Sequence, residues 1–155
     1  MFGQAKALAL TFALAQAAAA VGNAVVKNNC DFPVTLWSVG TNISPPNTIT
    51  PGGSYSEQFR TDPNTGGIAL KITRDPDGLW TGKPQTVYAY NLKDGRIWYD
   101  LSSVFGDTFA GCKLVECSAD TSCACIVWPN GTSPPGSQVK NCQPNADVTL
   151  TLCSQ

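Results

Sequence analysis

Apolar and polar residues alternate in short runs along most of the chain, which is typical of β-strands that bury one face. Turn-forming segments rich in proline, glycine and asparagine separate these runs, and no later segment carries a sustained helical stripe. We therefore predict an all-β fold, an antiparallel β-sandwich. The alternating apolar positions are Phe32, Val34, Leu36, Tyr55, Phe59, Ile68, Leu70, Ile72, Val148, Leu150 and Leu152.

The segment TVYAYNLKDGRIWYDLS, residues 86–102, predicts one hairpin in detail. Asp94-Gly95 lies between two aromatic strand runs, and this dipeptide favours a tight type I′ turn. The alternation then places Tyr88 and Tyr90 on one face of the hairpin and Ala89 on the other.

The first 24 residues have the composition of a secretory signal peptide. Lys6 precedes an apolar run from Ala7 to Ala15, and the small residues that follow suit signal peptidase. Cleavage between residues 17 and 24 stays open, either after one of Ala17 to Ala20 or after Ala24. We expect residues 25–155 to form a single exported domain without membrane insertion, because no later segment approaches about 18 continuous apolar residues.

The chain contains seven cysteines and no histidine. Without an imidazole base, Ser-His-Asp and Cys-His nucleophiles are excluded, and the commonest metal ligand is absent. The formal net charge is −1 and becomes one unit more negative when Lys6 leaves with the signal, so bulk charge recruits neither nucleic acid nor anionic lipid. We predict no cofactor and no metal, and we expect a monomer.

Seven cysteines in a short exported chain predict disulfides, because the extracellular compartment is oxidising, and they leave one thiol over. A bond between Cys30 and Cys153 would join the first predicted strand to the last. Closing such a long loop stabilises the folded state by roughly 4 to 5 kcal/mol in the entropy model.

Six segments carry a resemblance to a known family: NNCDFPVTLW, GGIALKI, PDGLWTG, YDLSSVFGDTFAG, CIVWPNG and DVTLTLC. They resemble the fungal family named after the Blastomyces yeast-phase-specific protein, within the thaumatin-like superfamily. The resemblance covers residues 24–153, and the segment at residues 99–111 is its most specific part. It implies a compact thaumatin-like sandwich stabilised by disulfides, without the cysteine-rich second domain of the plant proteins.

The resemblance also implies disulfide pairings. The first cysteine of the fold joins one near the carboxyl terminus, which supports a bond from Cys30 to Cys153. The cysteine before the IVWP strand, Cys123 or Cys125, would reach Cys142, and the family's spacing favours Cys123.

Cys112 and Cys117 lie outside the family's pattern, and they are expected to pair with each other or with Cys125. A thiolate zinc site made from these residues and Cys123 is disfavoured, since disulfides prevail in an oxidising compartment. The segment RDPDG at residues 74–78 lacks the further oxygen ligands of a calcium loop, so we expect an exposed turn there.

Some thaumatin-like relatives bind or cleave β-1,3-glucans with a Glu on the central strand and an Asp in the Tyr-Asp-x-Ser segment. Carried over to this sequence, the Asp is Asp100, but the Glu position falls on Ala89. A glycosidase needs two carboxylates roughly 5 to 9.5 Å apart, so the loss of one predicts a protein without catalytic activity. Other acids that folding could bring near Asp100 are Glu57, Asp75, Asp77 and Asp107.

A group of aromatic residues gives the best indication of a binding surface. Exposed rings stack on sugar faces, while neighbouring carboxylates accept hydrogen bonds from hydroxyls. We predict a ligand-binding set, with ordinary core packing as the alternative for each ring. The set is Trp80, Tyr88, Tyr90, Trp98 and Asp100.

We predict a secreted fungal protein, extracellular or in the cell wall, that recognises β-glucan-type polysaccharide or, like adhesins and effectors, a host or partner surface protein. The alternatives are a weak endo-β-1,3-glucanase or antifungal protein that uses an acidic cleft, and a purely structural wall protein. The sequon NGT at Asn130 predicts N-glycosylation, whereas Asn42 in NISP is a poorer acceptor because a proline follows.

Overall fold

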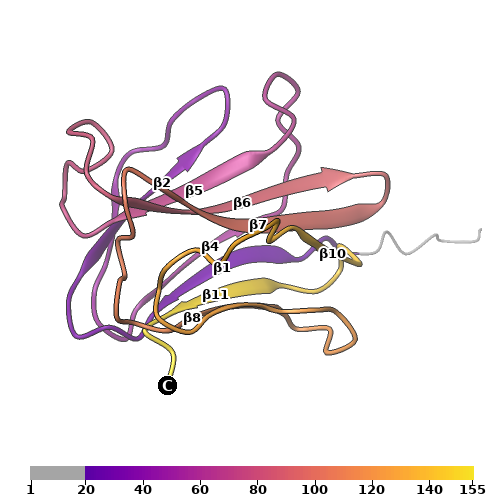
Figure 1. Ribbon diagram of the computed structural model, residues 1–155. Coiled ribbons are helices and arrows are strands. Elements are labelled where there is room, and N and C mark those ends of the chain that lie inside the picture. Colours follow the sequence, from indigo (N-terminus) through magenta and orange to yellow (C-terminus); the bar gives the residue numbers. More distant parts are fainter. Residues whose placement is uncertain (1–19) are drawn as a thin grey trace, which may run out of the picture.

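The computed structural model describes residues 20–155, which form eleven β-strands in two packed sheets (Figure 1). The five-stranded sheet has the order β4-β1-β11-β8-β9, and the six-stranded sheet has the order β10-β7-β6-β5-β2-β3. The predicted all-β sandwich is confirmed, and no helix within residues 20–155 is long and apolar enough to cross a membrane. The strands are β1 (Asn23–Asn28), β2 (Val34–Val39), β3 (Asn47–Ile49), β4 (Ser54–Gln58), β5 (Ile68–Thr73), β6 (Gln85–Lys93), β7 (Arg96–Val104), β8 (Leu114–Ser118), β9 (Ile126–Trp128), β10 (Lys140–Cys142) and β11 (Val148–Leu152).

Alternation along β1, β5, β8 and β11 separates a buried inner face from an outer face, whereas β2 is buried at five consecutive positions. In β5, Ile68, Leu70 and Ile72 are buried in the core, whereas Lys71 between them stays partly exposed. The inner faces of the two sheets supply the residues of one hydrophobic core. The runs inferred from period-two alternation fall on β2, β4, β5 and β11, although Phe32 and Phe59 lie just outside the strands.

The hairpin of β6 and β7 has the predicted two-residue turn. Lys93 pairs with Arg96, and the residues between them, Asp94 and Gly95, have φ values of 53° and 69°. Positive φ at both central positions defines the type I′ turn, which matches the twist of the flanking strands.

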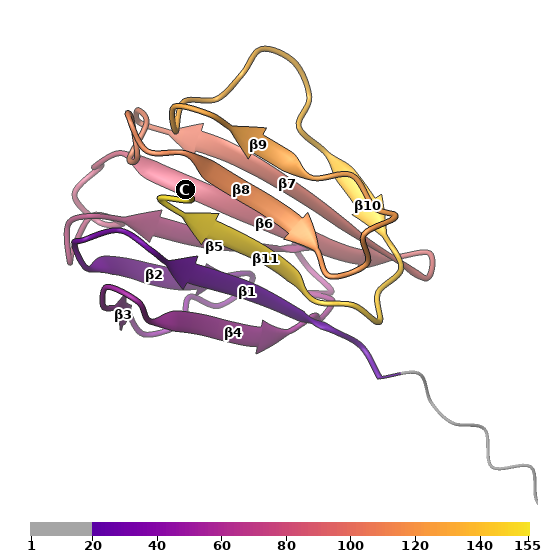
Figure 2. The ribbon, with the colours of Figure 1, turned by 90° about the horizontal axis from the view of Figure 1, so that it is seen from below.

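The first and last strands lie side by side in the five-stranded sheet (Figure 2). β1 and β11 pair in parallel, an exception to the predicted antiparallel arrangement. The predicted disulfide between Cys30 and Cys153 is confirmed directly beyond these two strands. Hydrogen bonds and a covalent bond thus hold the two ends of the domain together.

Two further disulfides lie around β8, β9 and β10. Cys123 bonds to Cys142, as predicted, and so connects the β8–β9 loop to an edge strand of the other sheet. Cys117 on β8 bonds to Cys125 directly before β9, which is one of the two pairings that the sequence left open.

Cys112 is unpaired, so the prediction that it forms a disulfide with Cys117 is wrong. Cys117 lies on β8, and Cys112 lies two residues before the first residue of this strand. Five residues of extended chain span roughly 16 Å, whereas a disulfide requires Cα atoms about 4.4 to 6.8 Å apart. The antiparallel approach of β9 instead brings Cys125 beside Cys117.

The folded domain includes residues that lie before the predicted boundary at residue 25. Ala24 is fully buried and pairs with Val148. The Gly22 amide donates to the Pro144 carbonyl at 2.7 Å, and the Gly22 carbonyl accepts from the Phe59 amide at 3.0 Å. Cleavage after Ala24 would remove these contacts. Residues 1–19, most of the predicted signal, lie outside the described residues.

Candidate functional site

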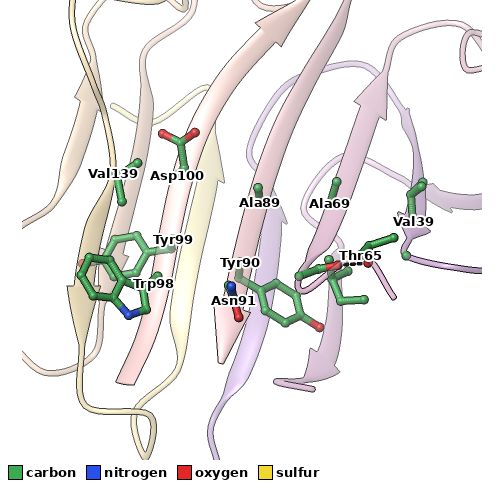
Figure 3. Close-up of a pocket in the computed structure, with 13 residues that line it drawn as sticks. Val39, Thr65, Ala69, Ala89, Tyr90, Asn91, Trp98, Tyr99, Asp100 and Val139 are labelled. Carbon is green, nitrogen blue, oxygen red and sulfur yellow. Dashed lines mark hydrogen bonds between the residues drawn. The ribbon is translucent and has the colours of Figure 1, made fainter. Parts of the chain in front are cut away.

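Register across the six-stranded sheet places four residues in one row on its outer face. Val39 pairs with Ala69, Ala69 with Ala89, and Ala89 with Asp100. The two neighbouring alanines leave a depression in the middle of the row, because their side chains end at Cβ. A cavity of about 520 Å³ lies here (Figure 3), a volume within the usual range for small-molecule sites.

One wall of this cavity comes from β7 and from the segment before β10. Trp98 lies two residues before Asp100 on the same face of β7 and is 39 % exposed. Val139 lies beside Asp100, and Asn91 pairs with Trp98 across the hairpin (Figure 3). The wall therefore offers an indole, a carboxylate and an amide on an otherwise apolar surface.

The opposite wall includes Thr65, from the loop before β5. Asp62 anchors this loop, because its carboxylate accepts hydrogen bonds from the Thr41 hydroxyl at 2.6 Å, the Thr41 amide at 2.7 Å and the Thr65 amide at 3.0 Å. These hydrogen bonds, led by that of the Thr41 hydroxyl, hold the pKa of Asp62 well below its usual value. A buried, ionised carboxylate thus fixes the loop that carries Thr65.

Asp100 is the one charged residue among the described residues that line the cavity. Burial raises the pKa of its carboxyl, and a hydrogen bond from the Leu101 amide partly offsets this effect. Within residues 20–155, the one ion pair closer than about 4 Å joins Arg60 to Glu57, so no cation neutralises Asp100. The carboxylate therefore remains available to hydrogen-bond donors on a ligand.

Tyr88 and Tyr90 are core residues, and their predicted role as ligand-stacking rings is corrected. They are 0 % and 2 % exposed, because their positions on β6 point between the sheets. The Tyr88 hydroxyl donates to the Val148 carbonyl at 3.0 Å, and the Tyr90 hydroxyl donates to Glu57 at 2.5 Å. Tyr90 borders the cavity, but its ring packs edge-on against Phe59 in the core.

Of the predicted set, the structure brings Trp98 and Asp100 together at the cavity. Trp80 is 68 % exposed on the loop between β5 and β6, and it does not line the cavity. Sequence reasoning missed Asn91, although the period-two pattern that places Ala89 on the outer face also places Asn91 there. It also missed Val139, which no strand pattern marks.

No carboxylate faces Asp100 at the position that pairs with it, since that position carries Ala89. Asp75 and Asp107 instead line a separate small cavity with Arg74. None of the other candidate acids lines the cavity over the alanines. These acids are Glu57, Asp75, Asp77 and Asp107.

Glu116 is an acid that sequence reasoning did not single out. It lies on β8, faces the core, is 0 % exposed, and neither carboxyl oxygen has a hydrogen-bond partner among the described residues. Burial, and secondarily the charge of Asp100, raises the pKa of Glu116 well above its usual value. This carboxyl is closed off from the cavity and from solvent.

The segment and the cysteines that were considered as metal sites form a turn and disulfides. RDPDG forms the expected turn, in which the Gly78 amide donates to the Asp75 carbonyl at 3.1 Å. Asp120 lies near Cys123 and Cys142, but these two sulfurs are bonded to each other. None of these groups is assigned a metal.

A family model described as Blastomyces yeast-phase-specific protein matches residues 11–154. The chain belongs to this family. The Antigenic thaumatin-like protein of Arthroderma benhamiae is 33 % identical over 158 residues, which cover 96 % of this chain and 75 % of that protein. The Secreted thaumatin-like protein calA of Emericella nidulans is 30 % identical and covers 96 % of this chain and 90 % of its own length.

Two solved structures share the thaumatin-like fold of this family member. The protein elicitor MoHrip2 from Magnaporthe oryzae superposes with a TM-score of 0.71 at 24 % identity, covering 86 % of this chain and 99 % of its own. The thaumatin-like xylanase inhibitor TLXI superposes with a TM-score of 0.57 at 13 % identity, covering 84 % and 98 %. The expected thaumatin-like β-sandwich is therefore confirmed.

Proposed function

We propose that this chain is a secreted, non-catalytic thaumatin-like protein that binds β-glucan-type cell-wall polysaccharide at the cavity over Ala69 and Ala89. The observation that carries the proposal is a partly exposed indole, Trp98, beside an unpaired carboxylate, Asp100. Indoles stack on sugar rings, and carboxylates accept hydrogen bonds from hydroxyls. Three disulfides, and a relative whose name describes a secreted protein, support export.

The absence of catalysis is inferred from the row that contains Asp100. Both mechanisms of glycoside hydrolysis require a second carboxyl group, and the cavity lining offers a single one. Ala89 occupies the paired position and supplies no acid or base. The cavity therefore holds a saccharide without the means to cleave it.

A sedimentation assay with insoluble β-1,3-glucan and chitin tests the proposal. Wild-type protein is expected to sediment with polysaccharide while releasing no reducing sugar. Trp98→Ala should lose most of the bound fraction, because it removes the stacking surface. Trp80→Ala is the matched control, since Trp80 is more exposed but lies outside the cavity.

Two results would contradict the proposal. Equal loss of binding in both tryptophan variants would show that the cavity is not the binding site. Sugar release that disappears in Asp100→Asn would show that the protein is a hydrolase.

Recognition of a host or partner surface protein is the second candidate function. Trp80 and Phe105 are 68 % and 67 % exposed on loops outside the cavity. Phe105 has a φ of 60°, an uncommon conformation for a bulky side chain that recurs at functional sites. The two similar solved structures are named an elicitor and an enzyme inhibitor, which fits a role in contact with other molecules.

Variants of the exposed loops and a variant of the cavity distinguish the two functions. If a protein partner is bound through the loops, Trp80→Ala and Phe105→Ala should reduce binding to host-cell surface proteins, while Trp98→Ala should not. The reverse pattern would support the cavity and the polysaccharide.

N-glycosylation at Asn130 remains a proposal that the local structure supports. Asn130 and Thr132 are exposed in the turn after β9. Gly131 between them has a φ of 66°, and a Cβ there would overlap the Phe109 carbonyl, so the turn shape itself requires glycine. Loss of a mass increment in Asn130→Gln expressed in a fungal host would establish the glycan, and an unchanged mass would exclude it.

A further inference from the structure

We infer that the cavity over Ala69 and Ala89 prefers a glycan that carries free, protonated amino groups over a neutral glycan. The inference rests on the proposed function, since it assumes that a saccharide occupies this cavity. It specifies the chemistry of that saccharide from the charge and the shape of the cavity.

The charge of the cavity is a single uncompensated negative one. Asp100 is the one charged residue of the described lining, and no Lys or Arg of residues 20–155 lies within about 4 Å of its carboxylate. Lys71, Lys93 and Arg96 share the outer face, and none of them lines the cavity. Lys71 pairs with Val87 in the next row and does not line the cavity, and the Arg96 side chain donates to Asn141 at 2.5 Å.

The surroundings of Asp100 make a cationic partner more favourable than a neutral one. Its side chain is partly buried beside Val139 and Ala89, so water solvates the carboxylate less well than it would on an open surface. A hydroxyl and an ammonium group both donate charge-assisted hydrogen bonds to a carboxylate. The ammonium group adds an attraction between opposite charges, which is stronger at a partly buried carboxylate than in bulk water.

The placement of Trp98 suits a sugar that carries the amine as a ring substituent. Trp98 and Asp100 lie two residues apart on one face of β7, which separates their Cα atoms by about 7 Å. Figure 3 shows both side chains along the same edge of the hollow, with Ala89 and Ala69 on the adjoining strands. A ring that packs on the indole can thus direct an amino group to the carboxylate. The indole face also attracts cations.

The apolar lining of the cavity, called the apolar floor below, provides a packing surface for the rest of the saccharide. Val39, Ala69, Ala89 and Val139 line the cavity and provide no donors or acceptors in their side chains. The C–H face of a sugar ring packs on such a surface, whereas a flexible polycation gains little from it. This floor favours an amino sugar over an unstructured basic peptide.

Isothermal titration with three hexasaccharides tests the inference. The probes are β-1,4-linked glucosamine hexamer, its fully N-acetylated form, and neutral laminarihexaose. The first two share one backbone and differ in the amine. We expect the glucosamine hexamer to bind wild-type protein about tenfold more tightly than either neutral probe, because only the ammonium group adds an attraction between opposite charges. Its affinity should fall with added salt, which screens the ion pair.

Two variants, each of which replaces a carboxylate by an amide of the same shape, test whether Asp100 causes the preference for the amine. Asp100→Asn should remove the preference for the amine, so that the glucosamine hexamer and its N-acetylated form bind that variant with affinities within about threefold of each other, since an amide carries no charge. Asp77→Asn is the matched control, because Asp77 is an exposed acid outside the cavity, and it should leave every affinity unchanged.

Each alternative result has a defined meaning. Equal affinity for all three hexamers would overturn the amine preference and leave the proposed polysaccharide function standing. Binding of no hexamer would overturn both. An equal effect of Asp77→Asn would show attraction by net charge instead of a site. Tighter binding of hexalysine than of the glucosamine hexamer would assign the carboxylate to a protein partner and overturn the glycan preference.

Discussion

Two carboxyl groups on facing sheets, Asp100 on β7 and Glu116 on β8, illustrate how differently the two layers use an acid. Burial raises the pKa of both. Asp100 lies on the outer face of the six-stranded sheet and lines a cavity, whereas Glu116 lies on the inner face of the five-stranded sheet and is fully buried. A raised pKa therefore reports burial in this protein, and access to a cavity distinguishes the acid that a ligand can reach.

The difference follows from the neighbours that the register supplies. Ala89 and Ala69 extend the row of Asp100 and leave space above the sheet. Glu116 pairs with Leu150 and Ile126, both buried in the core. Small neighbours on an outer face create a site, whereas large neighbours on an inner face enclose the acid.

The largest expected effect comes from removing the disulfide that joins the two ends of the domain, beside the five-stranded sheet that contains Glu116. Removing the Cys30–Cys153 disulfide with Cys30→Ser and Cys153→Ser should lower the free energy of unfolding by about 4 to 5 kcal/mol, because the bond closes almost the whole chain. Urea denaturation measures the change. Cys112→Ser is the control, since Cys112 is unpaired, and an equal loss in that variant would refute the explanation.

Substituting a tryptophan on an inner face and one on an outer face should have opposite consequences for stability and for binding. Trp128 is 0 % exposed and fills the core, so Trp128→Ala should cost about 3 to 5 kcal/mol of stability. Trp98→Ala should cost about 1 kcal/mol or less, because that indole is partly exposed on the outer face, yet it should lose most of the polysaccharide retention. Thermal denaturation run beside the sedimentation assay separates the two effects. Loss of binding in Trp98→Ala that merely follows unfolding would remove the distinction.

Replacing the buried acid should stabilise the protein at neutral pH. Glu116→Met removes a carboxyl without hydrogen-bond partners from the core and should raise the free energy of unfolding by about 1 to 3 kcal/mol. In the wild type, the unfolded chain ionises near the ordinary value of 4.5, while the folded carboxyl stays protonated to much higher pH. The folded state then holds more protons, so wild-type stability should fall as pH rises above that value.

Chemical denaturation between pH 4 and pH 8 tests whether wild-type stability falls with rising pH. Glu116→Met should flatten this dependence of stability on pH. Asp100→Asn is the matched comparison and should alter the profile much less, because Asp100 is partly exposed. A wild-type profile that rises throughout this range would contradict the assignment of Glu116.

The smallest expected effect concerns Asp62, whose pKa shift has the opposite sign. Its hydrogen bonds lower the pKa from the ordinary 3.8, so its contribution to stability is complete above that value and is lost as pH falls through the folded pKa. Asp62→Asn should therefore lower the melting temperature modestly at pH 7. The gap to wild type should narrow as the pH falls below 3.8, and a constant gap would show that the carboxylate charge plays no part.

The fold was largely predictable, because period two is a local property of the chain. Leu70, Ile72 and Leu150 lie on the inner faces that the alternation assigned to them. The Asp94-Gly95 turn was equally local, since its residue types specify the backbone conformation. The two disulfides implied by the family resemblance were also correct.

The site was predictable only in part. Trp98 and Asp100 are two residues apart, so one strand pattern places them together. Their partners on the far side of the cavity, Thr65 and Val39, lie on other elements and are brought near by sheet register and by the Asp62 loop. Tyr88 and Tyr90 were misassigned because aromatic composition does not tell which face of a strand meets the second sheet.

The sequence by itself determined the class of fold and the oxidising chemistry of its cysteines, because each depends on residue types and short spacings. The family resemblance implied the loss of a second acid at Ala89. Tertiary structure alone decided that Glu116 is enclosed, that Asp100 borders a hollow, and that Cys117 bonds to Cys125. These outcomes depend on which strands become neighbours and on how the two sheets face each other. Such pairings join residues far apart in the chain, and local alternation carries no information about them.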